Sequence, residues 1–498
     1  MKKGIITALL FAICILFALL ASCAESSQKD NDPQNTNLSA ENSETETETD
    51  ARQAILNLYK APNADYNGDE FKMQLRQFSN DSWGSSDVII EEESGDVVDD
   101  AIYMRNLEVE TALNIKLIPI YVNYDSQVKS LRTSIMSGDG AFDTVFTSFQ
   151  NGFEMANAGY LTNFAEVSGI DIFMPWWDQN LIKETSVMNK VYYMTGDIVT
   201  FDKRGTWTMM FNKDLHKKYD LPDIYEIVKN GDWTIEKLAE LCKGVTMDLN
   251  GDGKLDKGDQ VGVATTYDCI RSFFFATGLR IIKKDAADLP YFALENEQAI
   301  TNLEKVYNLF RSANDIVMFA NEHGDWSTTR DAFLENRALF YAEVMNYVQN
   351  LRSMETDFGV IPLPKANALQ DGYYTNIHLM ASEAVMIPFG TDDNTAERAG
   401  TVLEAMGYGG YKHIRPAYYE VSLKTKFARD DDSSDMIGLI LLGRSADLGY
   451  IGKIGGLLES LVSNIASRNN AFASTIESNS PKVYSEIEKL IEIYNELP

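Results

Sequence analysis

Histidine and cysteine are scarce in this sequence of 498 residues, which contains four of each. The histidines are scattered, and no paired Cys-x-x-Cys or His-x-x-x-His spacing occurs, so a zinc site is not indicated. No G-x-S-x-G, H-E-x-x-H or P-loop motif is present either, which argues against enzymes that depend on those motifs. Cys14 and Cys23 fall near the N-terminus. Cys242 and Cys269 could form a disulfide in an oxidising compartment or stay as buried free thiols.

Basic residues are outnumbered: 44 Lys and Arg stand against 74 Asp and Glu, for a formal net charge of −30. Nucleic acid is excluded as a partner on this ground, since its phosphates require basic patches. The same excess argues against docking of the folded body on anionic lipid. An acidic, well-solvated surface is the plain reading of this composition.

The long hydrophobic run of the sequence stands at its start, in "MKKGIITALLFAICILFALLASC". Two lysines, an apolar stretch and Leu20-Ala21-Ser22-Cys23 together predict a lipoprotein signal peptide over residues 1–22, with lipidation of Cys23. The alternative is an uncleaved transmembrane anchor. Residues 23–53 are polar and acidic, which predicts a disordered tether. We therefore expect a lipid-anchored protein on the extracellular face of the cell membrane, or in a periplasm.

The stretch "MDLNGDGKLDKGDQ" at 247–260 has the spacing of a twelve-residue calcium loop. The ligands predicted for Ca²⁺ are Asp248, Asn250, Asp252, Lys254 (through its carbonyl), Asp256 and Asp259, with Gly253 at the sharp turn. The competing interpretation is a surface turn without an ion, because Asp, Asn and Gly also favour loops. Since the loop occurs once, between a helical stretch at 233–245 and a strand-like run, we expect a structural ion rather than a sensor.

The body of the chain alternates strand-like and helix-like segments. Strands are predicted at 71–78, 115–121 and 143–148, with an amphipathic helix before the second and another before the third. This order is typical of α/β architecture with largely parallel sheets. Ligands collect at the carboxyl ends of such strands. Trp83, and Phe149 with Gln150, follow the first and third strands and are therefore placed to contact a ligand.

Several longer segments, taken in order, carry a family resemblance. They are "LRTSIMSGDGAFDTVFTSFQNGFEMANAGYLTNF", "TMMFNKDLHKKYDLPDIYEIVKNGDWTIEKLAELCKG", "DAFLENRALFYAEVMNYVQNLRSMETDFGVIPLPK", "YYTNIHLMASEAVMIP" and "ERAGTVLEAM". This ordered set resembles the extracellular solute-binding proteins of ABC importers, and most of all the carbohydrate-type family 1 in its lipoprotein form. The likeness covers residues 71 to about 450.

The resemblance implies a two-lobe clamshell, each lobe a mostly parallel sheet flanked by helices. Lobe 1 would comprise 54–200 and 375–415, and lobe 2 would comprise 201–374 and 416–498, with hinge crossings near 195–207, 370–380 and 412–422. A monomer of this kind would close on a carbohydrate, expected to be an oligosaccharide, and deliver it to the permease subunits of an ABC transporter.

Sugar sites combine aromatic platforms with polar side chains, and the sequence offers candidates for both. The candidates beyond Phe149 and Gln150 are Trp83, Trp207, Trp326, Tyr267, Glu343 and Tyr374. Each tryptophan could instead pack in a core. Glu343 could belong to a buried ion pair, because an acid in an apolar strand needs a partner. Lys203 and Arg204 leave an anionic sugar or a peptide open as the ligand.

Two other functions fit the same sequence. A ligand-binding lipoprotein could report to a membrane sensor kinase with the same clamshell. A secreted glycan-active hydrolase would need two carboxylates about 5 to 10 Å apart, and among 74 acidic residues such a pair can always be nominated. We therefore expect a binding protein and not an enzyme.

Overall fold

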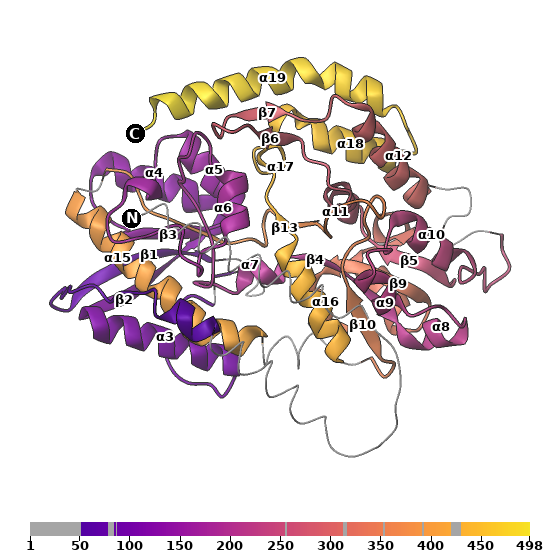
Figure 1. Ribbon diagram of the computed structural model, residues 1–498, viewed down its shortest axis with the longest axis horizontal. Coiled ribbons are helices and arrows are strands. Elements are labelled where there is room, and N and C mark those ends of the chain that lie inside the picture. The colour runs from indigo at the N-terminus through magenta and orange to yellow at the C-terminus, as the bar shows by residue number, and fades with distance from the viewer. Residues whose placement is uncertain are drawn as a thin grey trace, which may run out of the picture. The chain divides into compact units, whose positions relative to one another are not determined.

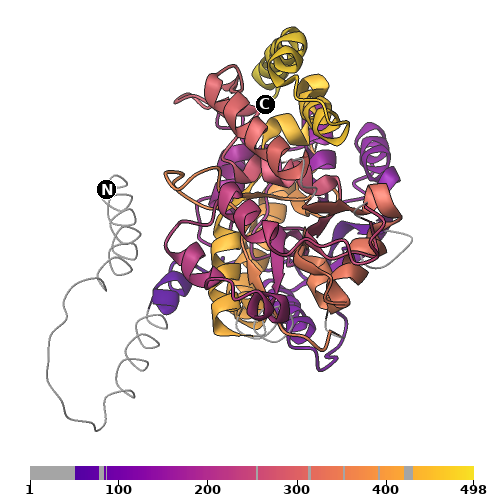
Figure 2. The ribbon, with the colours of Figure 1, turned by 90° about the vertical axis from the view of Figure 1, so that its right-hand side faces the viewer.

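The computed structural model describes residues 51–77, 84–85, 87–253, 256–311, 316–351, 354–390, 393–419 and 430–498 (Figures 1 and 2). The chain divides into two compact units, Met1–Leu58 and Tyr59–Pro498, and the second carries the architecture below. The signal peptide and Cys23 lie outside the described residues. Among the helices that are described, none is long and apolar enough to span a bilayer. Residues 51–56 are helical, although the predicted tether included 51–53; Ala, Arg, Gln and Leu all favour a helix there.

The first sheet has the strand order β12-β3-β1-β2. Its strands are β1 (Asp69–Gln77), β2 (Ile115–Asn123), β3 (Thr144–Thr147) and β12 (Ala384–Met386). β1 runs parallel to β2 and to β3, whereas β12 returns antiparallel to β3. The flanking helices are α3 (Val97–Leu113), α4 (Gln127–Ser137), α5 (Phe149–Asn157) and α15 (Asp393–Gly409). Asp96 caps the start of α3, and Asn114 ends it with a left-handed backbone.

The second sheet has the strand order β10-β4-β9-β5-β8. Its strands are β4 (Trp207–Asn212), β5 (Val261–Thr265), β8 (Val317–Phe319), β9 (Ala338–Val344) and β10 (Phe358–Ile361). β5 is parallel to β8 and β9, but β4 is antiparallel to β9 and β10. The predicted α/β class is confirmed, and this sheet is more mixed than predicted because β4 runs against its neighbours.

Three separate chain segments lie side by side between the two sheets. Thr206 bridges to Ile377, and the N–H of His378 donates to the carbonyl of Gly205 at 3.1 Å. β11 (Thr375–Asn376) then pairs in parallel with β13 (Arg444–Ser445). Segments of the predicted crossings 195–207 and 370–380 thus meet, together with β13. Of the predicted third crossing, 420–422 lies outside the described residues, and the π-helix Gly410–Ile414 packs against α3.

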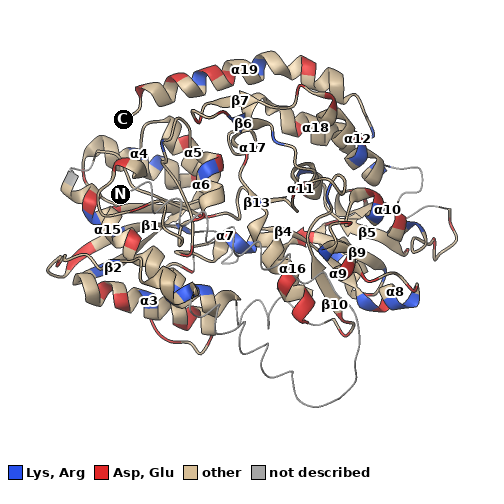
Figure 3. Cartoon of the chain, viewed as in Figure 1, with Lys and Arg blue, Asp and Glu red and all other residues tan. Residues whose placement is uncertain are grey.

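The C-terminal helix α19 (Phe472–Glu496) runs along one side of this unit. It contacts α5, α12 (Glu297–Arg311), α18 (Leu457–Ala466) and β7 (Pro290–Phe292), which pairs with β6 (Ile282–Lys284); both views place it beside α18 (Figures 1 and 2). The Tyr192 hydroxyl donates to the carbonyl oxygen of Pro498 at 2.6 Å, which fixes the chain end. Acidic residues, with a few basic ones among them, lie along α19 (Figure 3), as expected of a solvated face.

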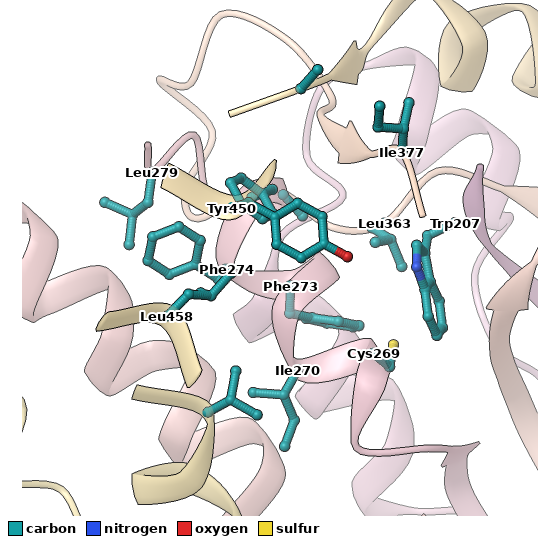
Figure 4. Close-up of a cluster of buried hydrophobic side chains, with 14 of the residues drawn as sticks. Trp207, Cys269, Ile270, Phe273, Phe274, Leu279, Leu363, Ile377, Tyr450 and Leu458 are labelled. Carbon is teal, nitrogen blue, oxygen red and sulfur yellow. The ribbon is translucent and has the colours of Figure 1, made fainter. Parts of the chain in front are cut away.

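A large hydrophobic cluster fills the interior beside α11 (Asp268–Ala276). Figure 4 shows Phe273 and Tyr450 within it, with Trp207 beside Leu363 and Cys269. Cys242 and Cys269 are both buried free thiols and do not form the disulfide that the sequence left open. Burial raises the pKa of both thiols above the ordinary range, which makes them poor nucleophiles.

Candidate functional site

The carboxyl edge of the first sheet gathers a buried polar group. Because β1 and β3 run parallel and β12 runs antiparallel to β3, Arg76 meets Glu383 at this edge. The Arg76 guanidinium donates to the carbonyls of Met380 at 2.7 Å and Ser382 at 3.1 Å, and its Nη2 lies 3.9 Å from Glu383. The same guanidinium lies 4.6 Å from the ring centre of Phe201. Arg76 therefore ties β1 to the residues that lead into β12.

Glu383 is fully buried beside this guanidinium. Ser85 donates its hydroxyl to one carboxylate oxygen, and the other oxygen has no hydrogen-bond partner among the described residues. Burial is the main reason that the pKa of Glu383 rises to about 7, and Arg76 opposes the rise. Near neutral pH this carboxyl can therefore act as a donor or as an acceptor.

Phe149 and Gln150, predicted as ligand contacts, begin α5 at this same edge. Ser148 caps the helix by accepting from the N–H of Asn151. Phe149 is fully buried, with its ring 5.8 Å from that of Tyr193, so it packs in the core; Gln150 is half-buried. Trp83 lies outside the described residues.

Lys203 and Arg204, which left an anionic ligand open, lie in α7 (Phe201–Arg204). Lys203 is buried and donates at 3.0 Å to the carbonyls of Gly196 and Val199, so its ammonium is fully used within the chain. Arg204 lies 3.9 Å from the carboxylate of Asp87, close to the first-sheet edge. Of these two cations, Arg204 is therefore the one that lies near the buried polar group of Arg76 and Glu383.

The corresponding edge of the second sheet brings Glu343 and Trp207 onto adjacent strands. Trp207 stands opposite Val344, and Thr208 stands opposite Glu343. The Trp207 side chain points into the hydrophobic cluster, however, and is only 2% exposed. In this structure it is a core residue and presents no open ring face.

Glu343 is buried at the end of β9 without a cation. It accepts from the N–H of Val344 at 2.8 Å, and no Lys, Arg or His in the described part of the chain forms an ion pair with it. Burial raises the pKa of Glu343 to about 8; the hydrogen bond from Val344 opposes the rise and Asp268 adds to it. The ion pair considered from the sequence does not form, and the carboxyl is held protonated at neutral pH.

Trp326, which is exposed, and Tyr347, which is half-buried and follows β9, form an aromatic pair. Trp326 opens α14 (Trp326–Leu334), is 46% exposed, and has its ring 5.4 Å from that of Tyr347 at an interplanar angle of 34°. The Arg330 guanidinium lies 4.8 Å from the Trp326 ring. Burial raises the pKa of Tyr347, and the charge of Glu343 adds to the rise. Trp326 is therefore partly exposed, and its role as a ligand contact stays a prediction.

Tyr267 and Tyr374 are bound by other residues of the described chain. The Tyr267 hydroxyl donates to Glu322 at 2.7 Å, and the Arg311 guanidinium lies 5.5 Å from its ring. Tyr374 donates to Asp371 at 2.7 Å and lines a different cavity. Both tyrosines are already engaged by neighbouring charged groups.

Arg76 and Glu383 were not among the residues singled out from the sequence. Each had the signal that selected Glu343, a charged residue next to an apolar strand: "FKMQLRQF" holds Arg76, and "MASEAVMIP" holds Glu383. Such a residue requires a partner when the strand is buried. Applying that rule to the predicted strand 71–78 would have found Arg76, whereas Glu383 borders a strand that was not predicted.

The Asp-rich loop is held by its own backbone. Asp248 accepts from the N–H groups of Gly251 and of Gly253, whose φ is +77°, and Asp259, which is buried, accepts from Leu249 and Asp256. In the described ranges no three His, Cys, Asp or Glu side chains converge as a metal ion requires, and Lys254 lies outside those ranges. The oxygen donors suit Ca²⁺ in type, and the left-handed glycine suits the required turn. The loop as it stands fits the ion in composition but does not form a closed ligand sphere.

Comparison with known proteins identifies the fold. No family model matches the sequence, and no curated protein matches it. A cyclo/maltodextrin-binding protein complexed with maltotetraose matches with a TM-score of 0.57 and 12% identity, over 84% of this chain and 98% of that one. The ABC substrate-binding protein Lmo0181 from Listeria monocytogenes in complex with cycloalternan matches at 0.54 and 11%, over 84% and 99%. The maltose-binding periplasmic protein MalE from Listeria monocytogenes in complex with maltose matches at 0.51 and 12%, over 84% and 98%. The protein therefore has the fold of these substrate-binding proteins.

Proposed function

We propose that the protein is a solute-binding protein that captures a carbohydrate and delivers it to the permease of an ABC transporter. The observation that carries this proposal is the likeness, over more than four fifths of the chain, to proteins solved with maltotetraose, cycloalternan and maltose. Those neighbours are named as binding proteins, which supports a role without bond breaking. The resemblance read from the sequence points to the same function independently.

Residues at the two sheet edges and on α14 support this proposal. The exposed part of the Trp326 ring, which lies beside Tyr347 and Arg330, would contact the C–H face of a sugar. Glu343 is held protonated and can donate one hydrogen bond to a hydroxyl while accepting another. Arg76 and Glu383, which are fully buried, would support the first-sheet side of the site from beneath and without touching the ligand. An oligosaccharide is favoured over a monosaccharide because the candidate groups are spread over both sheets.

Membrane attachment through Cys23 is part of the proposal, and it rests on Leu20-Ala21-Ser22-Cys23. A lipid there would hold the protein on the extracellular face of the membrane, or in a periplasm, near the permease. Cys23→Ala should then abolish the incorporation of labelled palmitate into the protein while leaving sugar binding unchanged. Incorporation equal to that of the natural protein would contradict lipidation of Cys23.

Calcium at 248–259 is proposed as a structural ion. Support comes from the donor types and from the left-handed Gly253 at the turn. Asp248, Asn250, Asp252, Asp256 and Asp259 would hold the ion, with the carbonyl of Lys254. The ion would pin the connection between α10 (Ile235–Lys243) and β5 and would not contact the sugar.

The experiment that tests the function is a thermal-shift screen of the purified protein against neutral oligosaccharides, amino acids and peptides. A ligand at a hundred times its dissociation constant adds about 2.7 kcal/mol of stability. We expect a neutral oligosaccharide to raise the melting temperature and to be recovered intact afterwards by chromatography. A response to peptides alone, or conversion of the sugar to products, would overturn the proposal.

A further inference from the structure

A cavity of about 380 Å³ lies against β13, away from Trp326 and Glu343. Its walls come from α6 (Gln179–Thr185), the β6–β7 hairpin, Tyr374 before β11, and the residues from Leu442 to Leu448 around β13. We call it the hinge pocket, because β13 pairs with β11 between the two sheets. Its volume falls in the range of small-molecule sites. Among the ligand residues predicted from the sequence, Tyr374 alone lines it.

The hinge pocket is basic in a protein that is acidic overall. Its lining includes Lys183, Arg280, Lys283, Lys284 and Arg444, against Glu184 and Asp447. Five basic and two acidic residues line the pocket, whereas the whole chain has 74 acidic and 44 basic residues. The local composition therefore favours an anion.

Most of these charges already have partners. Arg280 lies 3.3 Å from Glu184, Lys284 lies 2.6 Å from Asp288, and Arg444 binds Asp178 and Asp202. Asp447 is satisfied by backbone N–H groups, those of Ile281 and Gly449 among them, both at 2.6 Å.

Lys183 and Lys283 differ from the rest of the lining. Both are exposed, and neither forms an ion pair with any residue that the structure describes. They come from two different elements, α6 and β6, and line the same cavity. The cavity is therefore lined by two lysines that have no ion-pair partner among the described residues, and its volume suits a small ligand.

Aromatic surface lies beside these ammonium groups. Tyr291 stands directly opposite Lys283 in the β6–β7 register and is 46% exposed. Tyr374 carries the Arg280 guanidinium 5.2 Å from its ring centre, so one face of that ring is covered. An exposed tyrosine ring packs well against the C–H face of a pyranose. Asn180, whose amide donates to the carbonyl of Leu442 at 3.3 Å, adds a polar group to the wall.

We propose that the hinge pocket is a second ligand site, for a sugar-sized carboxylate such as a uronic acid. The ammonium groups of Lys183 and Lys283 take the carboxylate, and the Tyr291 ring takes the C–H face. This site is separate from the sheet edges that carry the proposed function. A ligand here contacts α6, the β6–β7 hairpin and β13 at once, so its binding would influence how these elements move relative to one another.

The test is isothermal titration of the purified protein with D-glucuronate and with D-glucose, which differ at the carboxylate. We expect glucuronate to bind and glucose to bind at least about tenfold more weakly. Raising the salt from about 50 to about 500 mM should weaken glucuronate binding, because exposed charges are screened. Lys183→Gln with Lys283→Gln should raise the Kd for glucuronate at least about tenfold. Lys217→Gln, an exposed lysine of α8 (Lys213–Lys218), should leave the Kd unchanged.

Failure of this site can be told apart from failure of the proposed function. The Lys183→Gln, Lys283→Gln double variant should keep the affinity for whichever neutral oligosaccharide the thermal screen identifies. Equal glucuronate affinity in the double variant and in the natural protein would overturn the second site. Displacement of glucuronate by an equal concentration of inorganic phosphate would also overturn it, because the pocket would then recognise charge and not a sugar acid.

Discussion

Arg444 on β13 donates through Nη1 to a carboxylate oxygen of Asp202 on α7 across 2.8 Å, and both side chains are buried. A second nitrogen of the guanidinium binds Asp178, which caps α6. Arg444, on the strand between the two sheets, thus binds one carboxylate from α7 and another from the residue that caps α6. Removing one member of a buried pair leaves a charge without compensation, which is more costly than the pair is stabilising.

Arg444→Met should therefore lower the free energy of unfolding by about 3 kcal/mol. Lys203, 3.2 Å from Asp202, keeps the loss from being larger. Urea denaturation followed by circular dichroism measures the effect. The control is Lys237→Gln, which removes the exposed pair with Glu240 and should cost less than about 0.5 kcal/mol. Similar stabilities for the two variants would contradict the stabilising role of the Arg444 ion pairs.

Trp207→Ala should destabilise the fold by about 3 to 5 kcal/mol, because it empties space in the core beside Cys269 and Phe273. The sequence had suggested a ligand platform, and the variant separates the two roles. If Trp207 were a platform, truncation would lower sugar affinity at nearly constant stability. Melting temperature and sugar titration on the same preparation distinguish these outcomes.

Trp326→Ala should show the opposite pattern. Its ring is exposed and rests on Tyr347, so truncation should change stability by less than about 1 kcal/mol. Sugar affinity should fall by about tenfold, a loss of about 1.4 kcal/mol of binding free energy. Trp326→Phe keeps an aromatic face and should retain most of the affinity. Unchanged affinity in Trp326→Ala would remove this residue from the site.

The elements of the fold could be predicted from local patterns. The strand predicted at 71–78 is β1 at Asp69–Gln77, that at 115–121 is β2 at Ile115–Asn123, and the helix predicted at 233–245 contains α10. Burial on alternate positions and helical periodicity are properties of a few neighbouring residues, which is why they can be read from sequence.

The direction of individual side chains could not be predicted in the same way. Trp207 and Trp326 both stand beside polar loops, yet Trp207 begins a buried central strand and Trp326 begins a surface helix. Their exposure is decided by packing partners distant in sequence, such as Ile377 for Trp207. β13 was missed for a similar reason, since two residues of strand carry no periodicity.

Asp252→Ala tests the proposed calcium site. If Ca²⁺ binds the loop, millimolar calcium should raise the melting temperature of the natural protein over that in EDTA, and the variant should lose most of this rise. Sugar binding at saturation should be unchanged, because the proposed ion would hold the loop after α10 and would not contact the sugar. Glu70→Ala, which removes an exposed carboxylate outside the loop, should respond to calcium like the natural protein. No difference between calcium and EDTA in the natural protein would favour a plain surface turn.

Glu343→Gln tests the buried carboxyl at the end of β9. Its pKa in the folded protein is about 8, above the ordinary value of 4.5, so between these two pH values the folded state holds a proton that the unfolded state has lost. The stability from this group is therefore complete below about pH 4.5 and is lost as the pH rises through about 8. Glutamine keeps the shape of the protonated acid and cannot ionise.

The difference in unfolding free energy between Glu343→Gln and the natural protein should consequently grow in favour of the variant from pH 5 to pH 8.5. A few kcal/mol is the expected order of magnitude. Glu383, whose pKa is also raised, is present in both proteins, so its effect cancels in the difference. Urea titrations at the two pH values, with Glu70→Gln as the exposed control, supply the measurement. A difference that does not change with pH would mean that Glu343 is ionised in the folded protein, and it could then only accept hydrogen bonds from a sugar.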